Sequence, residues 1–180
     1  MTAPAIPGYV AGTWDIDPVH SSVNFTVRHL GVTKVRGRFN TVSGQIITGP
    51  TLADSSVTAT IESDSVDTKH DQRDGHVKSP DFLDTATHTS LNFRSTGVRE
   101  DAGEYFIDGE LTLRGVSKPV TLNAEVGGFG PGMSEGATVI GVSATTEISR
   151  GEFGVGENIP AAVVSDKIKI ELDIEAILQA

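Results

Sequence analysis

The chain has 180 residues, of which 37% are hydrophobic and 21% are charged, and this balance excludes an intrinsically disordered chain. The length fits a single domain over residues 1–180, and folding at this size buries roughly 70% of the surface of the unfolded chain. The net charge of −10 disfavours binding to nucleic acid or to an anionic lipid surface, since no segregated basic patch is visible, and the lack of cysteine excludes disulfides and thiol nucleophiles.

The N-terminal segment, Met1–Gly8, has neither the basic start nor the continuous apolar stretch of a secretory signal. We therefore expect a cytoplasmic protein. No stretch approaches the roughly 20 apolar residues that a membrane-spanning helix needs, so we expect no insertion into a membrane.

Apolar and polar residues alternate along most of the chain, which is typical of strands with one solvent-exposed face. The alternation predicts strands over residues 10–17, 23–29, 34–48, 57–61, 91–93, 105–113, 120–126, 140–144 and 168–176. It is irregular over 34–48, where Gly37 and Gly44 indicate a bend or bulge. Short turns separate most of these segments, so neighbours in sequence should pair antiparallel. About eight or nine strands in one domain predict an all-β fold, either a closed barrel or a sandwich.

One segment, Asp67–His76, lacks this alternation. Asp67 or Thr68 can cap a short helix, and Asp71 lies favourably in its first turn. We predict a helix over residues 68–77, followed by a loop. Because the insert lies between two predicted strands, it could cover the mouth of a barrel.

Several short motifs follow one another along the chain. They are Trp14-x-Ile16-Asp17-Pro18-x-His20-Ser21, Val23-x-Phe25-x-Val27-x-His29-Leu30, Val35-x-Gly37-x-Phe39, Ser65-Val66-Asp67-Thr68, Arg73-Asp74-x-His76, Asp81-Phe82-Leu83-Asp84, Gly109-Glu110-Leu111-Thr112-Leu113-x-Gly115-Val116-x-Lys118-Pro119-Val120 and Ile148-x-Arg150-x-x-Phe153-Gly154. Each is weak alone, but in this order and spacing they resemble the YceI-like, polyisoprenoid-binding family over nearly the whole chain.

The resemblance implies a lipocalin-like antiparallel β-barrel of about eight strands with a short helical insert. It also implies an apolar tunnel that holds an isoprenoid or another extended lipid, often in a dimer and often in the periplasm. The secretory signal of the family is not visible here. On the location of the protein, the sequence therefore departs from the resemblance, and we expect the cytoplasm.

The alternating rows identify side chains that should point into the barrel. The pattern alone leaves open whether they fill the interior or line a cavity, and the resemblance favours a cavity. The predicted lumen residues that would bind the lipid are Val23, Phe25, Val27, Phe39, Leu91, Phe93, Leu111, Leu113, Val142, Ala144, Ile168 and Ile170.

Polar groups at the mouth of such a site would orient the head of the ligand. The candidates are His29, Arg73, Asp74 and His76, since arginine can bind a phosphate, phenol or quinone oxygen and histidine can donate or accept. Alternatively, Arg73 and Asp74 hold the insert onto the barrel by ion pairs and capping bonds. Arg150 is open to both interpretations.

Lipid binding has two alternatives from other functional classes. The alternative is a metal-dependent or acid-base enzyme that uses the insert, where His70 lies one helical turn from Asp74. Carboxylates at a helix start are usually caps, and the sequence has no nucleophile elbow, His-Glu-x-x-His motif or phosphate loop. His20 is expected to organise the first turn. We therefore expect a non-enzymatic protein without catalytic residues, metal or cofactor.

A protein-interaction module is the second alternative, but the alternating Lys and Glu residues of 167–175 indicate a solvated wall. The expected partner is an isoprenoid or another long-chain apolar ligand, taken up for sequestration, storage or transport. A homodimer is compatible with each of these interpretations, and nucleic acid is not an expected partner.

Overall fold

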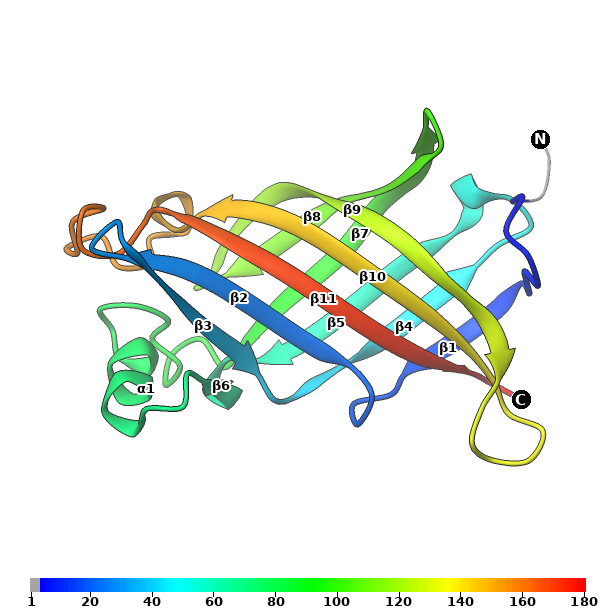
Figure 1. Ribbon diagram of the computed structural model, residues 1–180, viewed down its shortest axis with the longest axis horizontal. Coiled ribbons are helices and arrows are strands. Elements are labelled where there is room, and N and C mark those ends of the chain that lie inside the picture. Colours follow the sequence, from blue (N-terminus) through cyan, green and yellow to red (C-terminus); the bar gives the residue numbers. More distant parts are fainter. Residues whose placement is uncertain (1–3) are drawn as a thin grey trace.

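The alternating segments form one curved antiparallel sheet in the computed structural model, which describes residues 4–180 (Figure 1). The first residues of the N-terminal segment in which no secretory signal is visible lie outside this range. The strands are β1 Gly12–Ile16, β2 Ser22–His29, β3 Thr33–Phe39, β4 Val42–Thr48, β5 Ser56–Glu62, β6 Val66–Asp67, β7 Ser90–Asp101, β8 Glu104–Leu113, β9 Val116–Pro131, β10 Thr138–Ser149 and β11 Lys167–Leu178.

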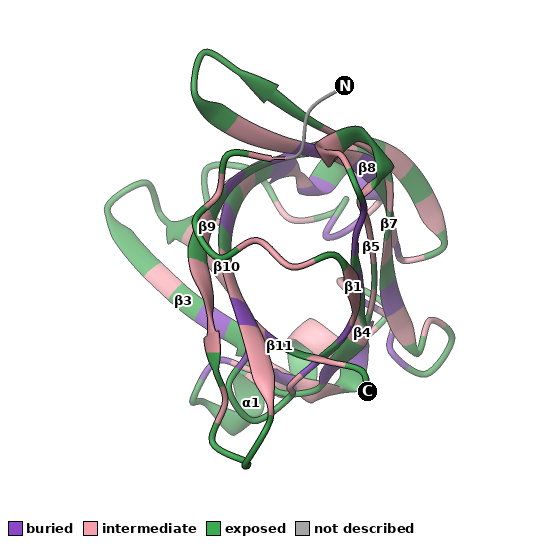
Figure 2. Cartoon of the chain, turned by 90° about the vertical axis from the view of Figure 1, so that its right-hand side faces the viewer, coloured by how far each residue is buried: buried purple, intermediate pink, exposed green. Residues whose placement is uncertain are grey.

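The sheet closes on itself. Its strand order is β1-β4-β5-β7-β8-β9-β10-β11, and β11 pairs in turn with β1, where Trp14 lies opposite Leu178. Seen from the end opposite the helix, the strands form a ring (Figure 2). The structure thus confirms the predicted all-β fold, a closed antiparallel barrel of eight strands.

Strand β11 shares one of its edges between two partners. Its residues 169–173 pair with β2, and its residues 176–178 pair with β1. Beyond the bend that separates β1 from β2, the sheet continues as β2, β3 and β6, and β3 pairs with β6 only at Arg38 and Phe39. The insert that carries α1 lies beside the end of the barrel at which β3 pairs with β6 (Figure 1).

Helix α1 spans Asp71–Lys78, so the predicted start at Thr68 is wrong. The N-cap is His70, whose Nδ1 accepts a hydrogen bond from the N–H of Arg73. Asp67 belongs to β6, and its carboxylate accepts from the N–H two residues later, so the chain turns before the helix begins. Within residues 4–180, no helix is long and apolar enough to cross a membrane.

The single irregular strand predicted over 34–48 is two strands, β3 and β4, and the bulges lie elsewhere than at Gly37 and Gly44. The ladders that contain Gly37 and Gly44 are in regular register, whereas register shifts occur at residues 95–97 and 141–142. Gly37 lies against the ring of Phe25, which occupies the space that a Cβ would need. Close approach of a neighbouring side chain, and not a bulge, requires this glycine.

An aromatic cluster lies at the end of the barrel opposite α1. Trp14 is fully buried, and its ring centroid lies 5.5 Å from that of Phe129, which is 5.4 Å from that of Tyr9. The indole N–H of Trp14 donates to the hydroxyl of Thr48 over 2.8 Å. Since the buried polar atom has its partner, the cluster is stably packed, and it is called the aromatic floor below.

Candidate functional site

A cavity of about 510 Å³ lies inside the barrel. It extends from Ile16 and Ile46, near the aromatic floor, to Val163 and Val164 at the end that carries α1. Its wall is almost entirely aliphatic and aromatic. The volume falls within the range of roughly 300–1,000 Å³ that is typical of small-molecule sites, so the interior can hold a ligand.

All of the predicted lumen residues lie in the cavity wall. These are Val23, Phe25, Val27, Phe39, Leu91, Phe93, Leu111, Leu113, Val142, Ala144, Ile168 and Ile170. Their common wall follows from the strand period, because every second side chain of a barrel strand points inward. Whether they contact a ligand stays a prediction.

Part of the cavity wall comes from segments outside the strands, and the sequence did not predict it. Val155, Ile159, Val163 and Val164 line the cavity from the segment between β10 and β11. Val77, Phe82 and Leu83 line it from α1 and the loop that follows. None of these belongs to an alternating row, so the available signals were their hydrophobicity within polar segments and, for Phe82 and Leu83, the motif Asp81-Phe82-Leu83-Asp84.

Three of the predicted polar residues, His29, Arg73 and His76, lie in the wall at the end that carries α1, and all three are exposed. The Nε of Arg73 donates to the Thr68 hydroxyl over 2.9 Å, and its Nη2 donates to the Thr68 carbonyl oxygen over 2.7 Å. Within residues 4–180, Nη1 of Arg73 has no hydrogen-bond acceptor. The guanidinium is therefore held in place while part of it stays free to donate.

His76 is oriented by two neighbours. Its Nε2 lies 3.1 Å from Oδ2 of Asp81, and its ring packs edge-on against Phe82 with centroids 4.9 Å apart. The backbone of His29 bridges to Val164. Both histidines thus stand on segments fixed to the barrel end, on the rim of the cavity.

Asp74 lies outside the cavity wall, which differs from its predicted place at the mouth. One oxygen of its carboxylate accepts from both the backbone N–H and the hydroxyl of Thr68. Since Thr68 in turn accepts from Arg73, the three residues form one network at the start of the insert. This arrangement corresponds to the alternative interpretation, in which Asp74 holds the insert in place.

The insert does not bring its metal-like residues together. The Nδ1 of His70 is occupied as a helix cap, and Asp74 is engaged with Thr68. Within residues 4–180, the only group that could hold a metal ion is Asp17, His20 and Glu175, which lies outside the cavity. The alternative of a metal site in the insert therefore gains no support.

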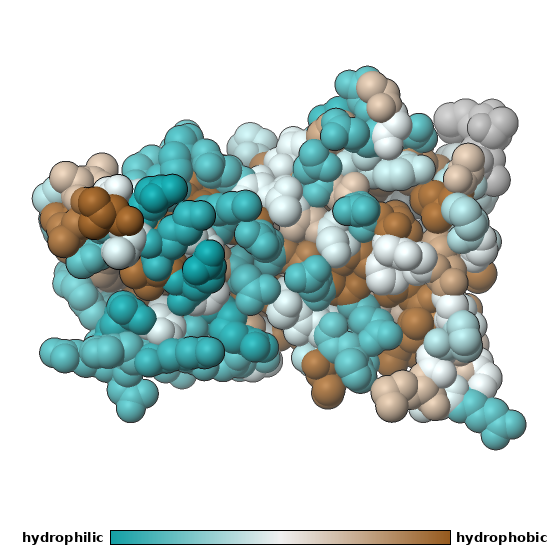
Figure 3. Space-filling model, viewed as in Figure 1, coloured by the Kyte–Doolittle hydropathy of each residue, from teal (hydrophilic) through white to brown (hydrophobic). Residues whose placement is uncertain are grey.

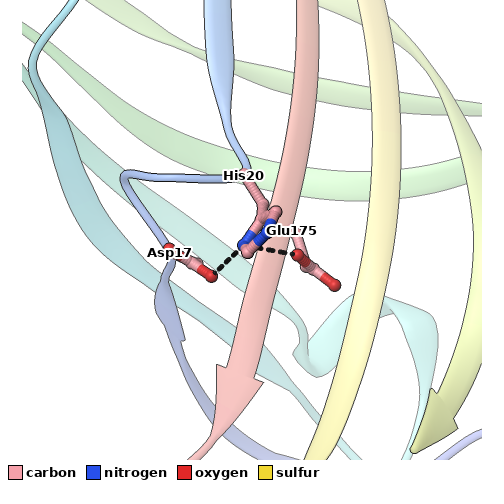
Figure 4. A group of neighbouring side chains, drawn as sticks. All are labelled: Asp17, His20 and Glu175. Atoms are coloured by element: carbon pink, nitrogen blue, oxygen red, sulfur yellow. Dashed lines mark hydrogen bonds and ion pairs between the residues drawn. The ribbon is translucent and has the colours of Figure 1, made fainter. Parts of the chain in front are cut away.

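The group of Asp17, His20 and Glu175 ties the bend between β1 and β2 to β11 (Figure 4). The Nδ1 of His20 lies 2.7 Å from Oδ2 of Asp17 and 3.3 Å from Oε2 of Glu175. The hydrogen bond to Asp17 and the charges of both carboxylates raise the pKa of His20, and the bond to His20 lowers the pKa of Asp17. When His20 is protonated, Nδ1 carries the proton that faces both carboxylates and cannot bind a metal ion at the same time. The triad is thus an ion-paired clasp, in keeping with the expected role of His20 in the first turn.

Arg150 is buried in the cavity wall, where only 4% of its surface is exposed. All five of its side-chain hydrogen bonds go to backbone carbonyl oxygens, those of Val155, Gly156, Ile159, Val164 and Ser165. These residues form the segment that covers one end of the barrel. The geometry supports the structural interpretation of Arg150, as the residue that holds this cover.

Comparison with known proteins agrees with the fold and the motif order. Residues 14–176 match the YceI-like domain family. The chain is 37% identical to a UPF0312 protein of Vibrio parahaemolyticus, over 97% of this chain and 93% of that protein. The solved structure of a Campylobacter jejuni YCEI protein has a TM-score of 0.76 and 29% identity, over 85% of this chain and 90% of that one.

A polyisoprenoid binding domain from Saccharophagus degradans has the same fold, with a TM-score of 0.67 and 17% identity over 94% of this chain and all of that one. The family match covers every motif from Trp14 to Gly154 on which the resemblance was based. The resemblance is thereby confirmed, and the chain belongs to the YceI-like family.

Proposed function

We propose that this protein binds an extended apolar lipid, a polyisoprenoid or an isoprenoid quinone or its precursor, inside the barrel. The observation that carries the proposal is the 510 Å³ apolar cavity, which has His29, Arg73 and His76 at one end and Ile16 and Ile46, next to the aromatic cluster, at the other. The shape fits a molecule with a long apolar tail and one polar head. The name of the Saccharophagus degradans domain, which has the same fold, adds support.

Burial of the tail supplies the affinity. Each buried methylene-sized group contributes about 0.8 kcal/mol of gross transfer free energy, so about twenty such groups contribute roughly 16 kcal/mol. The loss of translational and rotational freedom on association costs roughly 4–15 kcal/mol. Burial of a tail of a few five-carbon units therefore exceeds this cost without any polar contact.

The polar rim orients the ligand. The free Nη1 of Arg73 can donate to a head-group oxygen, and His29 and His76 can donate or accept beside it. The protein then sequesters, stores or carries the lipid, and it performs no chemistry on it. No step of this function requires a metal or a cofactor.

Native mass spectrometry combined with organic extraction of the purified protein tests the proposal. We expect a prenyl lipid to be extracted, or added prenyl quinone to bind to emptied protein. The chain has one tryptophan, Trp14, in the floor of the barrel. A bound quinone should quench its fluorescence. Protein that contains no lipid, binds no added prenyl compound and shows no quenching would refute the proposal.

A further inference from the structure

The outer face of the β2–β3 hairpin is basic, although the net charge of the chain is −10. Residues 18–53 contain no Asp or Glu, and the basic residues of this stretch, Arg28, Lys34, Arg36 and Arg38, are all exposed. They alternate with the inward side chains of the hairpin, so they share its outer face. The expectation that no basic patch is segregated is therefore wrong, since pairing of the two strands creates one.

The pairing leaves this charge uncompensated near the tip of the hairpin. Arg28 lies directly opposite Lys34, and like charges at opposite positions of an antiparallel pair are destabilising. Arg38 lies opposite Asp67 of β6, whereas Arg28, Lys34 and Arg36 form no ion pair within residues 4–180. These three cations therefore present uncompensated positive charge to solvent.

The tip of the hairpin is apolar and strained. Leu30 and Gly31 have φ values of 55° and 71°, in a left-handed conformation that Asn and Gly adopt readily and a bulky residue does not. Even so, the surface of Leu30 is 57% exposed and that of Val32 is 77% exposed. Neither packing within the chain nor the geometry of the turn accounts for apolar side chains here.

The tip lies at the mouth of the cavity. The N–H of Leu30 donates to the carbonyl oxygen of Val163 over 2.9 Å, and both Val163 and His29 line the cavity. Val163 is itself 38% exposed, so it extends the apolar tip. The space-filling view shows apolar surface at this end of the molecule, next to strongly polar side chains (Figure 3).

We propose that this hairpin docks the protein on a bilayer that contains anionic lipids. Leu30 and Val32 enter the boundary between head groups and acyl chains, and Arg28, Lys34 and Arg36 lie against the lipid phosphates. An apolar tip flanked by cations is the arrangement that peripheral membrane proteins use. The acidic remainder of the surface is repelled, so the protein docks in one orientation, with the mouth of the cavity towards the bilayer. Docking goes beyond the proposed function, since it requires no bound lipid.

Co-sedimentation with vesicles tests the role of the charges. We expect binding to vesicles of equal parts phosphatidylcholine and phosphatidylglycerol at low salt, little binding to phosphatidylcholine alone, and weakening by high salt. Each cation near an anionic surface contributes roughly a fivefold gain, so Lys34→Gln with Arg36→Gln should lower the partition coefficient about thirtyfold. The control is Arg94→Gln with Lys118→Gln, which removes equal charge from an exposed position on β7 and a half-buried position on β9 and should leave binding unchanged.

A second pair of variants tests the apolar tip. Leu30→Asn with Val32→Thr keeps the charges and suits the left-handed turn, so the hairpin should form while vesicle binding falls about tenfold or more. The matched control is Met133→Gln, in the loop between β9 and β10, where the side chain is 94% exposed. Circular dichroism and the lipid content by native mass spectrometry should match the wild type for every variant.

The proposal is overturned if the wild type does not bind anionic vesicles or binds neutral vesicles equally well. It is also overturned if neither pair of substitutions weakens vesicle binding. Binding to an acidic polypeptide without binding to vesicles would also overturn it, and would assign the hairpin to a protein partner. A protein that docks on vesicles but never contains lipid would refute only the proposed function of the cavity.

Discussion

Arg150 shows how one buried side chain can determine the shape of a long segment. The guanidinium carries its donors in a rigid planar fork, so it reaches backbone carbonyl oxygens between Val155 and Ser165 from one position. A lysine ammonium has three donors on a single atom and cannot reach all of these acceptors. The cover of the barrel therefore depends on arginine chemistry and not only on a positive charge.

We expect Arg150→Lys to lower the free energy of unfolding by about 2–4 kcal/mol, because several buried carbonyl oxygens lose their donors. Urea denaturation measures this change. Arg94→Lys, at an exposed position of β7, serves as the control and should change it by less than about 0.5 kcal/mol. Amides of residues 155–165 should also exchange faster in the variant. Unchanged exchange would mean that other contacts hold the cover.

The clasp of Asp17, His20 and Glu175 makes stability depend on pH. The pKa of His20 is raised above its ordinary value of 6.5, so its contribution is complete below 6.5 and is lost as the pH rises through the raised pKa. The pKa of Asp17 is lowered below 3.8, so its contribution is present above 3.8 and is lost as the pH falls through the lowered pKa.

The stability difference between the wild type and His20→Gln should therefore be largest between pH 3.8 and 6.5 and should shrink on either side. Denaturation of both proteins over a series of pH values measures it. A difference that stays constant with pH, or that increases above the window, would contradict the role of the ion pairs.

At the scale of the elements, β10 shows how one strand separates the cavity from solvent. Val142 and Ala144 line the cavity, whereas Ser143 and Thr145 are exposed. We expect Val142→Trp or Ala144→Trp to fill the lumen and abolish ligand binding in native mass spectrometry, with the far-ultraviolet circular dichroism of the barrel retained. Thr145→Trp places the same ring on the outside of the same strand and should bind as the wild type does. Equal binding by all of these variants would place the ligand elsewhere.

Some elements of the barrel could be predicted from the sequence, and others could not. Strand alternation identified the rows that line the cavity, because in a barrel strand the period itself decides which side chains face inward. The start of α1 was missed because its cap is His70, a residue type outside the usual capping set. The wall segment around Val155 and Val164 has no period, and its path is fixed by Arg150 through contacts that are distant in sequence.

At the scale of the whole molecule, the closure of the sheet into a barrel could not be derived from local sequence patterns. Alternation is the same in a barrel and in a sandwich, and the motif order distinguished them. The division of the β11 edge between β1 and β2 depends on register between strands more than 140 residues apart, since Ser22 pairs with Asp173. The basic face of the hairpin has the same origin, because the repulsion of Arg28 and Lys34 exists only once β2 and β3 pair.

The pairing of Trp14 with Leu178 also has a consequence for biosynthesis. Of the strands that build the barrel, β11 leaves the ribosome last, and until then β1 and β10 expose free edges. Such long-range pairing makes folding slow, so the unclosed sheet should be a target for chaperones. The cavity exists only after this step, and a ligand can be captured no earlier than the end of translation of β11.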